Sequence, residues 1–475
     1  MQQFLQRDGV DGRGADYAAM VARKLAMVAP SGITERVEMP AGLFPHQAAL
    51  TAWALRRGRA AIFADTGLGK MRMELVWADV VRKHTGRPIM IHTPLAVAAQ
   101  LAAEAAKIGI QATVVREADE VVPGINITNY DRLHKFDTSI FGGVVLDESG
   151  CIKHSDSRTF RLLTDAYRDT PFKLPATATP APNDWTELGT HAEFLGICTK
   201  QEMLAEYFTH DGGDTSVWRL KGHARELFWR WVATWGAMIR KPSTLGFDDG
   251  AYNLPPLHLH EHHVAFEMPL NGMLFAAEAQ TLQERREARR QSLADRVREC
   301  AAMVNADKAE PWVVWCDLNA EGDALAKAIP DAAQISGADD TETKERRLID
   351  FAEGRVRVLI SKPSICGWGL NWQHAARMAF VGVTDSYEAY YQAVRRCWRF
   401  GQTRPVHVHI FASKAEGAIV ANLKRKEREA GEMADALSTE TQEAVMAAVT
   451  GATRETNTYN ADKPVSLPAF LRRAA

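Results

Sequence analysis

The chain has 475 residues, of which 46% are hydrophobic and 24% are charged, and its formal net charge is -2 at pH 7. This composition excludes a fibrous or wholly disordered protein, and the length favours two substantial domains over one core. Because the net charge is close to zero, binding to a polyanion would have to come from local basic patches and backbone amides.

Cysteine usage and the N-terminal segment bear on the compartment. The six cysteines form no C-x-x-C pair and no spacing typical of a zinc site. The N-terminal segment lacks the apolar core of a signal peptide, and no apolar run reaches membrane-spanning length. The sequence therefore predicts a reduced, cytoplasmic protein that does not enter a membrane.

The first half of the chain reads as an α/β lobe. Residues 1–40 are expected to form an N-terminal helical extension, because 16–28 place apolar groups at helical spacing. From 41 to 254, apolar runs alternate with amphipathic stretches, which predicts a parallel sheet wrapped by helices. Aromatic-rich sequence at about 200–241 predicts a helical insertion. The expected strands lie at 60–64, 88–93, 112–115, 125–129, 143–147 and 172–179.

The second half repeats this alternation. A Pro pair at 255–256 marks a plausible hinge, and 255–430 are predicted to form a second α/β lobe. Residues 431–475 are predicted to form a C-terminal helix followed by a flexible tail. The expected strands of this lobe lie at 254–265, 311–316, 333–337, 356–361, 377–383 and 406–411.

A glycine-containing loop follows the first strand of the first lobe and precedes a helix, which is the setting of a phosphate-binding loop. Glycines allow the backbone to approach phosphates, the loop amides face the anion, and the lysine can reach the β- and γ-oxygens. The next residue, Met71, stands where a hydroxyl residue normally ligates Mg²⁺, and a thioether is a poor ligand for that ion. The loop residues are Asp65, Thr66, Gly67, Leu68, Gly69 and Lys70.

An apolar strand at 143–147 ends in two acids, Asp147 and Glu148. By itself a strand that ends in two acids is more often a solvated turn than a catalytic pair. Together with the phosphate loop, the pair favours catalysis, with Asp147 holding Mg²⁺ and Glu148 orienting and deprotonating the attacking water. The sequence therefore predicts an ATP hydrolase that uses Mg²⁺.

The remaining motifs resemble, in order, those of the superfamily II helicases and translocases, and within them the Swi/Snf-type group, over roughly residues 40–430. The resemblance implies two RecA-like lobes that clamp ATP between them and move on double-stranded DNA, with RNA a less favoured track. In the first lobe it implies that Gln47 reads the adenine base. It also implies contact with nucleic acid, or coupling to hydrolysis, for Thr93, Pro94, Thr128, Asn129, Thr177 and Thr179.

In the second lobe, residues 392–402 resemble the family motif Q-x-x-x-R-x-x-R-x-G-Q. Its two arginine positions are Arg396 and Arg399; if they lie on a helix, their i, i+3 spacing places them on one face, where they could reach the γ-phosphate on lobe closure. The family's usual small residue and His are replaced here by Arg395 and Trp398. The resemblance also implies nucleotide or nucleic-acid contacts for Gly369, Asn371, Gln373 and Gln392.

Three other features have a simpler interpretation. His258, His260 and His262 alternate along a strand as metal ligands can, but a connecting strand is favoured. The arginines of 285–298 are interspersed with acids, which favours a solvated helix face over a phosphate-binding one. The aromatic residues of 227–235 have helical spacing, which favours core packing over base stacking.

Two alternatives to an independent motor stay open at this stage. Met71 allows a module that binds ATP and DNA but hydrolyses ATP poorly. The lack of any nuclease signature in the chain allows a motor subunit of a larger nuclease or modification complex.

Overall fold

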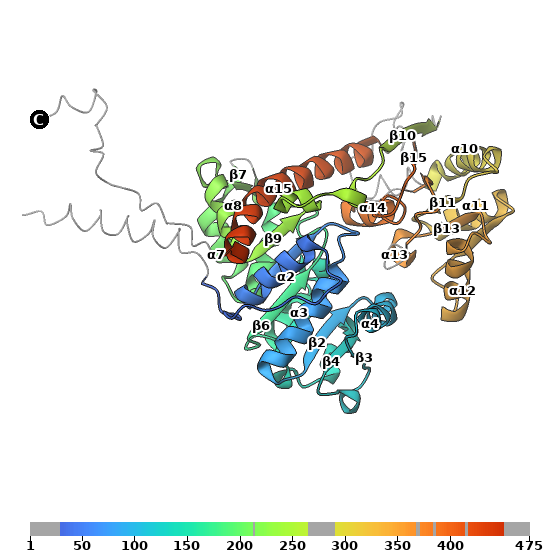
Figure 1. Ribbon diagram of the computed structural model, residues 1–475. Coiled ribbons are helices and arrows are strands. Elements are labelled where there is room, and N and C mark those ends of the chain that lie inside the picture. Colours follow the sequence, from blue (N-terminus) through green and yellow to red (C-terminus); the bar gives the residue numbers. More distant parts are fainter. Residues whose placement is uncertain are drawn as a thin grey trace, which may run out of the picture.

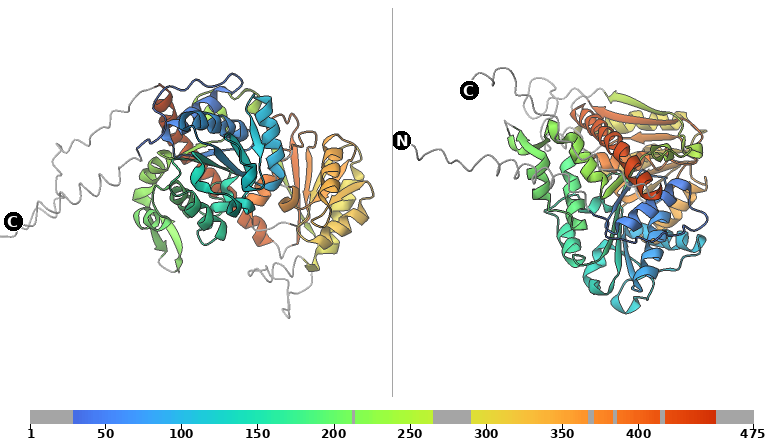
Figure 2. Two further views of the ribbon diagram at one scale, coloured as in Figure 1. Left: turned by 90° about the horizontal axis from the view of Figure 1, so that it is seen from below. Right: turned by 60° about the vertical axis from the view of Figure 1, so that its left-hand side comes forward.

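The computed structural model describes residues 29–211, 214–264, 290–366, 371–382, 386–413 and 417–450. Within these residues the chain forms two α/β lobes side by side (Figures 1 and 2). The expected leading helix at 16–28 and the expected tail beyond 450 lie outside the described residues, as do Arg285, Arg286 and Arg289.

The first lobe is built on a sheet of seven described strands, all paired in parallel. Its central strands are buried along their whole length, and parallel strands covered on both faces read as continuous apolar runs. In order across the sheet, the strands are β3 (Ala112–Val114), β4 (Ile125–Asn129), β2 (Ile89–Thr93), β5 (Gly143–Asp147), β6 (Phe172–Ala176), β1 (Ala61–Ala64) and β9 (Gly236–Ile239).

Helices cover both faces of this sheet. One face packs against the helices α2 (Pro45–Arg57), α3 (Lys70–Thr85) and α4 (Ala98–Lys107). The other face packs against α5 (Arg158–Ala166), α6 (Leu188–Leu195), α7 (Lys200–Tyr207) and α8 (Arg225–Ala233). Each face therefore has its own apolar core, and the sheet lies between them.

The second lobe is built on a sheet of six described strands, again all parallel. In order they are β10 (Leu257–Val264), β15 (Val406–Ser413), β14 (Arg377–Phe380), β11 (Trp312–Trp315), β13 (Val358–Ser361) and β12 (Ala332–Ile335). Around it lie α10 (Leu293–Ala306), α11 (Asn319–Ala328), α12 (Thr341–Ala352), α13 (Pro363–Cys366) and α14 (Tyr387–Val394). The predicted α/β class, with two lobes that are each a parallel sheet wrapped by helices, is confirmed.

The predicted helical insertion is helical only in part. Between α7 and α8 the chain forms an antiparallel hairpin of β7 (Phe208–Asp211) and β8 (Asp214–Leu220). After α8 it enters β9, which pairs in parallel with β1 and forms an edge of the main sheet. The aromatic run at 227–235 does pack as predicted, because Phe228, Trp229 and Trp235 are buried in the core of the first lobe.

The last described element, α15 (Gly417–Thr450), belongs to both lobes. Its first turns place Ile419, Val420 and Leu423 in the core of the second lobe. Farther along, Met433, Ala434 and Leu437 enter the core of the first lobe. Figure 1 shows this helix, in red, running from α14 across the first lobe to α8. One continuous helix therefore ties the two lobes, and it crosses the boundary predicted at 430.

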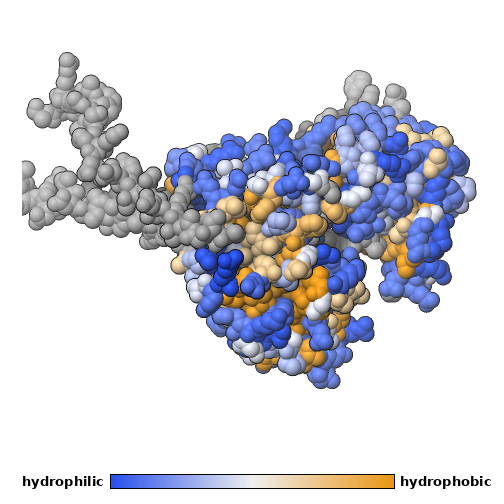
Figure 3. Space-filling view, viewed as in Figure 1, coloured by the Kyte–Doolittle hydropathy of each residue, from blue (hydrophilic) through white to orange (hydrophobic). Residues whose placement is uncertain are grey.

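The surfaces of the lobes differ on the face shown in Figure 3. Apolar side chains gather over the first lobe, whereas the second lobe is mostly hydrophilic. Two exposed large apolar residues, Phe44 and Leu95, belong to the first lobe. Among the described helices, none has the length and apolar character needed to cross a bilayer.

The anchoring of α15 can be tested at Leu437, which is fully buried in the first lobe. Leu437→Ala leaves a cavity and should cost about 2–5 kcal/mol of unfolding free energy. We expect a clear drop in the thermal unfolding midpoint, measured by calorimetry. Gln442→Ala, an exposed substitution on the same helix, is the matched control and should leave the midpoint unchanged. Equal midpoints for the two variants would contradict the anchoring role of α15.

Candidate nucleotide site between the lobes

The phosphate loop connects β1 to α3, as predicted. Gly67 and Gly69 have positive φ angles of 89° and 82°, a conformation that glycine adopts without strain. A Cβ on Gly69 would lie 2.2 Å from Nε2 of Gln47, and one on Gly67 would lie 3.2 Å from Cβ of Phe400. The loop is therefore pressed between a side chain of the first lobe and one of the second, and its glycines are needed for close approach.

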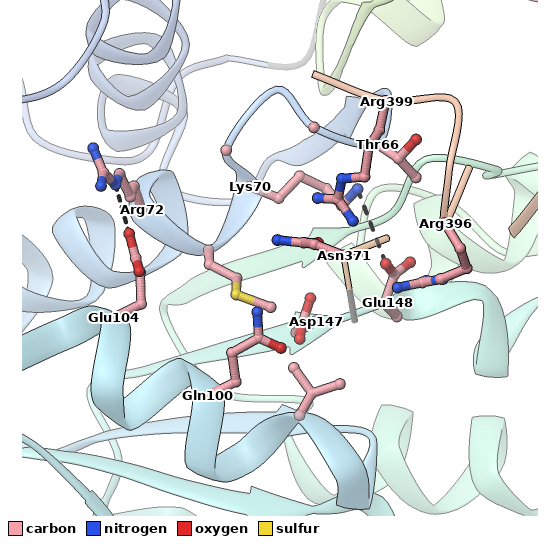
Figure 4. A pocket seen from close by; sticks show the side chains of 14 residues that line it. Thr66, Lys70, Arg72, Gln100, Glu104, Asp147, Glu148, Asn371, Arg396 and Arg399 are labelled. Carbon is pink, nitrogen blue, oxygen red and sulfur yellow. Dashed lines mark hydrogen bonds and ion pairs between the residues drawn. The ribbon is translucent and has the colours of Figure 1, made fainter. Parts of the chain in front are cut away.

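Lys70 begins α3 and directs its ammonium group into the site. Its Nζ donates to the carbonyl of Ala64 at 3.1 Å and lies 4.0 Å from Oε1 of Glu148. The residue is only 8% exposed. Figure 4 shows Lys70, Glu148, Arg396 and Arg399 around one space.

The acidic pair lies where β5 ends, next to the loop. Asp147 is 2% exposed, and the Thr93 hydroxyl donates to its Oδ2 at 2.6 Å. Burial, with the neighbouring Glu148 charge, raises the pKa of Asp147 to about 6. Glu148 has a φ of 53° and is the one non-glycine residue with positive φ among the described residues. Such strained backbone is concentrated at functional sites, where the surrounding structure enforces it.

A third carboxyl group, Glu74, lies beside this pair. It sits on α3 one turn after Lys70 and is fully buried. Burial, with the nearby Asp147 charge, raises the pKa of Glu74 well above its usual range. No sequence motif marked Glu74. Its i+4 spacing from Lys70 was the available signal, because this spacing places both residues on one helix face.

The second lobe contributes Arg396 and Arg399. Both follow α14 in a turn, so the helix considered for them ends just before the motif arginines, at Val394. They nevertheless line the same cavity as Lys70 and the acidic pair. Burial lowers the pKa of Arg396 to about 9, partly offset by Glu148, and burial lowers that of Arg399 to about 10. Both guanidinium groups stay charged near pH 7.

These residues enclose a cavity of about 230 Å³ between the lobes. Its walls also include Arg72 and Glu104, which form an ion pair at 2.7 Å and were not predicted. The complete lining is Thr66, Gly67, Gly69, Lys70, Met71, Arg72, Val97, Gln100, Glu104, Asp147, Glu148, Asn371, Arg396 and Arg399.

Gln47 supports the phosphate loop. Its Nε2 donates to the Leu68 carbonyl at 2.9 Å, and its Oε1 accepts from the Phe44 amide at 3.0 Å. The side chain is buried, and it does not line the cavity. Its contact with adenine stays a prediction.

Two threonines expected to touch nucleic acid are buried. Thr93 is fully buried with its hydroxyl on Asp147, and Thr128 is 1% exposed. Contact of these two residues with nucleic acid stays a prediction. The hydroxyl of Thr177 accepts from the Thr179 amide at 3.2 Å, just after β6. Pro94 and Asn129 follow Thr93 and Thr128 at the same edge of the sheet.

Residues 395–401, which follow α14 and carry Arg396 and Arg399, form what we call the arginine turn. Polar residues of the second lobe hold this turn in shape. Gln373 Nε2 donates to the Phe400 carbonyl at 3.1 Å, and Gln392 accepts from Arg396 through its backbone carbonyl at 3.3 Å. Gln402 Nε2 lies within 3.2 Å of three carbonyl oxygens, those of Gln373, Ala375 and Cys397. Asn371 reaches the cavity itself, whereas Gly369 lies outside the described residues.

The carboxyl groups fit a magnesium ion. Mg²⁺ in nucleotide sites usually takes one or two carboxylates, with substrate phosphates and water completing its shell. Asp147 and Glu148 supply such carboxylates at the cavity wall, next to Lys70. Among the described residues no group of three His, Cys, Asp or Glu side chains could hold a metal alone, so the phosphates would supply the remaining ligands.

The structure bears on two of the simpler interpretations. Arg296, assigned to a solvated helix face, is fully buried and pairs with Glu321 at 2.8 Å, so that assignment is wrong for this residue. The histidines of β10 face two more on β15. His260 and His407 nitrogens lie 3.0 Å apart, and those of His262 and His409 lie 2.9 Å apart. The ladder joins two strands within the second lobe.

The raised pKa of Asp147 gives a testable pH dependence of stability. The folded value of about 6 exceeds that of an unfolded aspartate, so protonation stabilises the folded state below about pH 4. This stabilisation is lost as the pH rises through 6. Asp147→Asn, uncharged at every pH, should therefore raise unfolding free energy at pH 8 by on the order of 2 kcal/mol and give no gain at pH 4.

Thermal unfolding without nucleotide or Mg²⁺ at both pH values measures this effect. Asp156→Asn, at an exposed position of the same lobe, should change the midpoint at neither pH. An Asp147→Asn variant that is no more stable than wild type at pH 8 would show that the buried charge carries no such cost.

Parts of the chain are similar to known proteins. Among solved structures, the chain is similar to the Sulfolobus solfataricus SWI2/SNF2 ATPase core in complex with dsDNA, with 15% identity and a TM-score of 0.40. The similarity covers 88% of this chain and 97% of that one. No curated protein matches the sequence significantly. Residues 298–401, from α10 to the end of the arginine turn, match the family model described as helicase conserved C-terminal domain.

Proposed function

We propose that the chain is an ATP hydrolase that couples hydrolysis between its lobes to movement along double-stranded DNA. The observation that carries the proposal is the composition of one cavity. Lys70, Asp147 and Glu148 of the first lobe line it together with Arg396 and Arg399 of the second. The match of residues 298–401 to a helicase domain supports the same activity class.

The residues divide the chemistry between the two lobes. The loop amides and the Lys70 ammonium bind the phosphates of ATP, since both offer donors to an anion. Mg²⁺, held by Asp147 and by phosphate oxygens, would neutralise phosphate charge. Glu148 accepts the proton of the water that attacks the γ-phosphorus, while the bond from that phosphorus to the bridging oxygen breaks. Arg396 and Arg399 stabilise the charge that develops on the γ-phosphoryl oxygens.

Movement follows from the division of the site. Because the arginines belong to the second lobe, hydrolysis requires the lobes to be closed, and product release allows them to separate. A DNA duplex held by both lobes would then be gripped alternately by each. The preference for duplex DNA rests on the order of the Swi/Snf-type motifs in the sequence.

Met71 favours a second candidate, a module that binds ATP and DNA and hydrolyses slowly. The residue lines the cavity next to Lys70, where a hydroxyl would offer magnesium an oxygen ligand. A thioether gives the ion no such ligand. The two candidates differ in turnover and not in binding, so kinetics separate them.

The motor function predicts ATP hydrolysis that duplex DNA stimulates. Glu148→Gln keeps the size of the side chain and removes the proton acceptor, so it should lower kcat by about 100-fold or more. ATP binding, measured by fluorescence titration, should be retained. Steady-state phosphate release with and without duplex DNA gives the readout. Wild-type protein that shows no DNA stimulation, and no loss on Glu148→Gln, would favour the slow binding module.

Met71 can be tested directly by restoring a hydroxyl. Met71→Thr should lower the Mg²⁺ concentration for half-maximal hydrolysis by roughly 10-fold, which corresponds to about 1.4 kcal/mol of ion binding. Met71→Leu, similar in volume to methionine and without an oxygen, is the matched control and should behave as wild type. An unchanged Mg²⁺ dependence in Met71→Thr would show that this position does not limit the metal site.

A further inference from the structure

Two residues depart from the second-lobe motif: Arg395 contacts the first lobe, and Trp398 contacts the segment that joins the lobes. Arg395 Nη2 lies 2.7 Å from Oδ2 of Asp65 and donates to the Thr66 carbonyl at 3.0 Å. Arg395 Nε donates to the Thr66 hydroxyl, and the Tyr391 hydroxyl donates to Oδ1 of Asp65. The second lobe therefore grips the phosphate loop at its first two residues.

This contact is buried. The side chains of Arg395 and Asp65 are 4% and 13% exposed. A pair at such depth is screened little by salt, and removing one partner leaves the other charge without compensation. It differs in this respect from the many surface ion pairs of the chain, which contribute little to stability.

Trp398 extends the contact to the segment that joins the lobes. The Arg395 guanidinium lies 4.9 Å from the centre of the Trp398 ring, a distance typical of a cation–π contact. The indole Nε1 of Trp398 donates to the Pro255 carbonyl at 2.7 Å, just before β10. Arg395 and Trp398 thus act together: Arg395 contacts the phosphate loop, and Trp398 contacts the segment that joins the lobes.

The position of Arg395 and Trp398 determines the position of the catalytic arginines. Arg396 follows Arg395 directly, and Arg399 follows Trp398 directly. The Gln402 side chain bonds to carbonyls on both sides of this turn and holds it in shape. A shift of Arg395 relative to Asp65 would therefore displace Arg396 and Arg399 relative to the phosphates.

We propose that Arg395 is a positioning residue that latches the second lobe onto the phosphate loop through Asp65, and so sets where Arg396 and Arg399 meet the γ-phosphate. The inference rests on the proposed function for its kinetic consequence. The latch itself is a contact between lobes and can be measured without hydrolysis. Neither Arg395 nor Asp65 lies in an apolar core, so each lobe should stay folded when the latch is removed.

The experiment compares Arg395→Ala, Asp65→Ala and the double variant in the full chain. Small-angle scattering without nucleotide should show a larger radius of gyration for all three variants than for wild type. In steady-state hydrolysis, kcat should fall roughly 10- to 100-fold, as expected when catalytic groups are displaced by about 1 Å. The KM for ATP should change much less, because Lys70 and the loop amides still bind the phosphates.

The double variant tests the pairing. If Arg395 and Asp65 act through one another, the kcat of the double variant should match that of the single variant with the lower kcat, since the contact is already lost there. Arg395→Lys, which keeps a charge for Asp65 but lacks the guanidinium that also bonds to Thr66, should be intermediate. Arg404→Ala is the matched control, because Arg404 forms a 2.8 Å ion pair with Glu310 within the second lobe. It should leave both the radius of gyration and kcat unchanged.

Either of two results would overturn the latch: a wild-type radius of gyration in Arg395→Ala, or effects of the two alanine substitutions that multiply in the double variant. Circular dichroism and the thermal midpoint of each variant verify folding. Failure of the proposed function is a separate outcome. In that case wild-type protein would not hydrolyse ATP, and the scattering comparison would still decide whether the latch exists.

Discussion

Charge gathered at one edge of the first sheet is the constraint on which the site depends. The carboxyl ends of β2, β5, β6 and β1 are neighbours, so residues far apart in sequence meet there. Three acids, Glu74, Asp147 and Glu148, lie close to Lys70, and burial raises the pKa of Glu74 and of Asp147. The edge therefore holds two buried carboxyl groups with raised pKa values, and strained backbone at Glu148. Such features cost stability and are kept where a ligand uses them.

The second lobe completes this charge arrangement. Arg396 and Arg399 bring positive charge to a cavity wall that also bears Asp147 and Glu148. Their placement depends on how the lobes sit against one another, and two kinds of contact govern that. The helix α15 inserts side chains into the cores of both lobes. Arg395 joins the arginine turn to the phosphate loop. The buried apolar side chains of α15 hold the two lobes together. The polar contact of Arg395 with Asp65 sets the distance between the arginines and the phosphate loop.

The packing of α15 and the contact of Arg395 with Asp65 would respond differently when the lobes open and close. Side chains of α15 buried in close-packed cores cannot slide without losing contacts, so motion should occur around the helix and not within it. The contact between Arg395 and Asp65 is instead a polar one made by a small number of atoms, and under the proposed latch it breaks when the lobes separate and forms again when they close. The substitution at Arg395 is therefore where the chain differs mechanically from the family pattern that its motif resembles.

The sequence by itself determined the parts whose physical cause is local. Strands buried on both faces read as apolar runs, so all strands expected between 60 and 179 were found, and the phosphate loop was marked by its glycines and Lys70. Tertiary structure alone decided the rest. The strand β9, hidden in an aromatic segment, is a strand because β1 offers it an edge. Arg296 is buried because Glu321 neutralises it from another helix. In the sequence, Arg395 is one more basic residue. In the folded chain it lies 2.7 Å from Asp65, which is 330 positions earlier. Pairing across such separations depends on which surfaces the folded lobes present to each other, and no local pattern of residues records that.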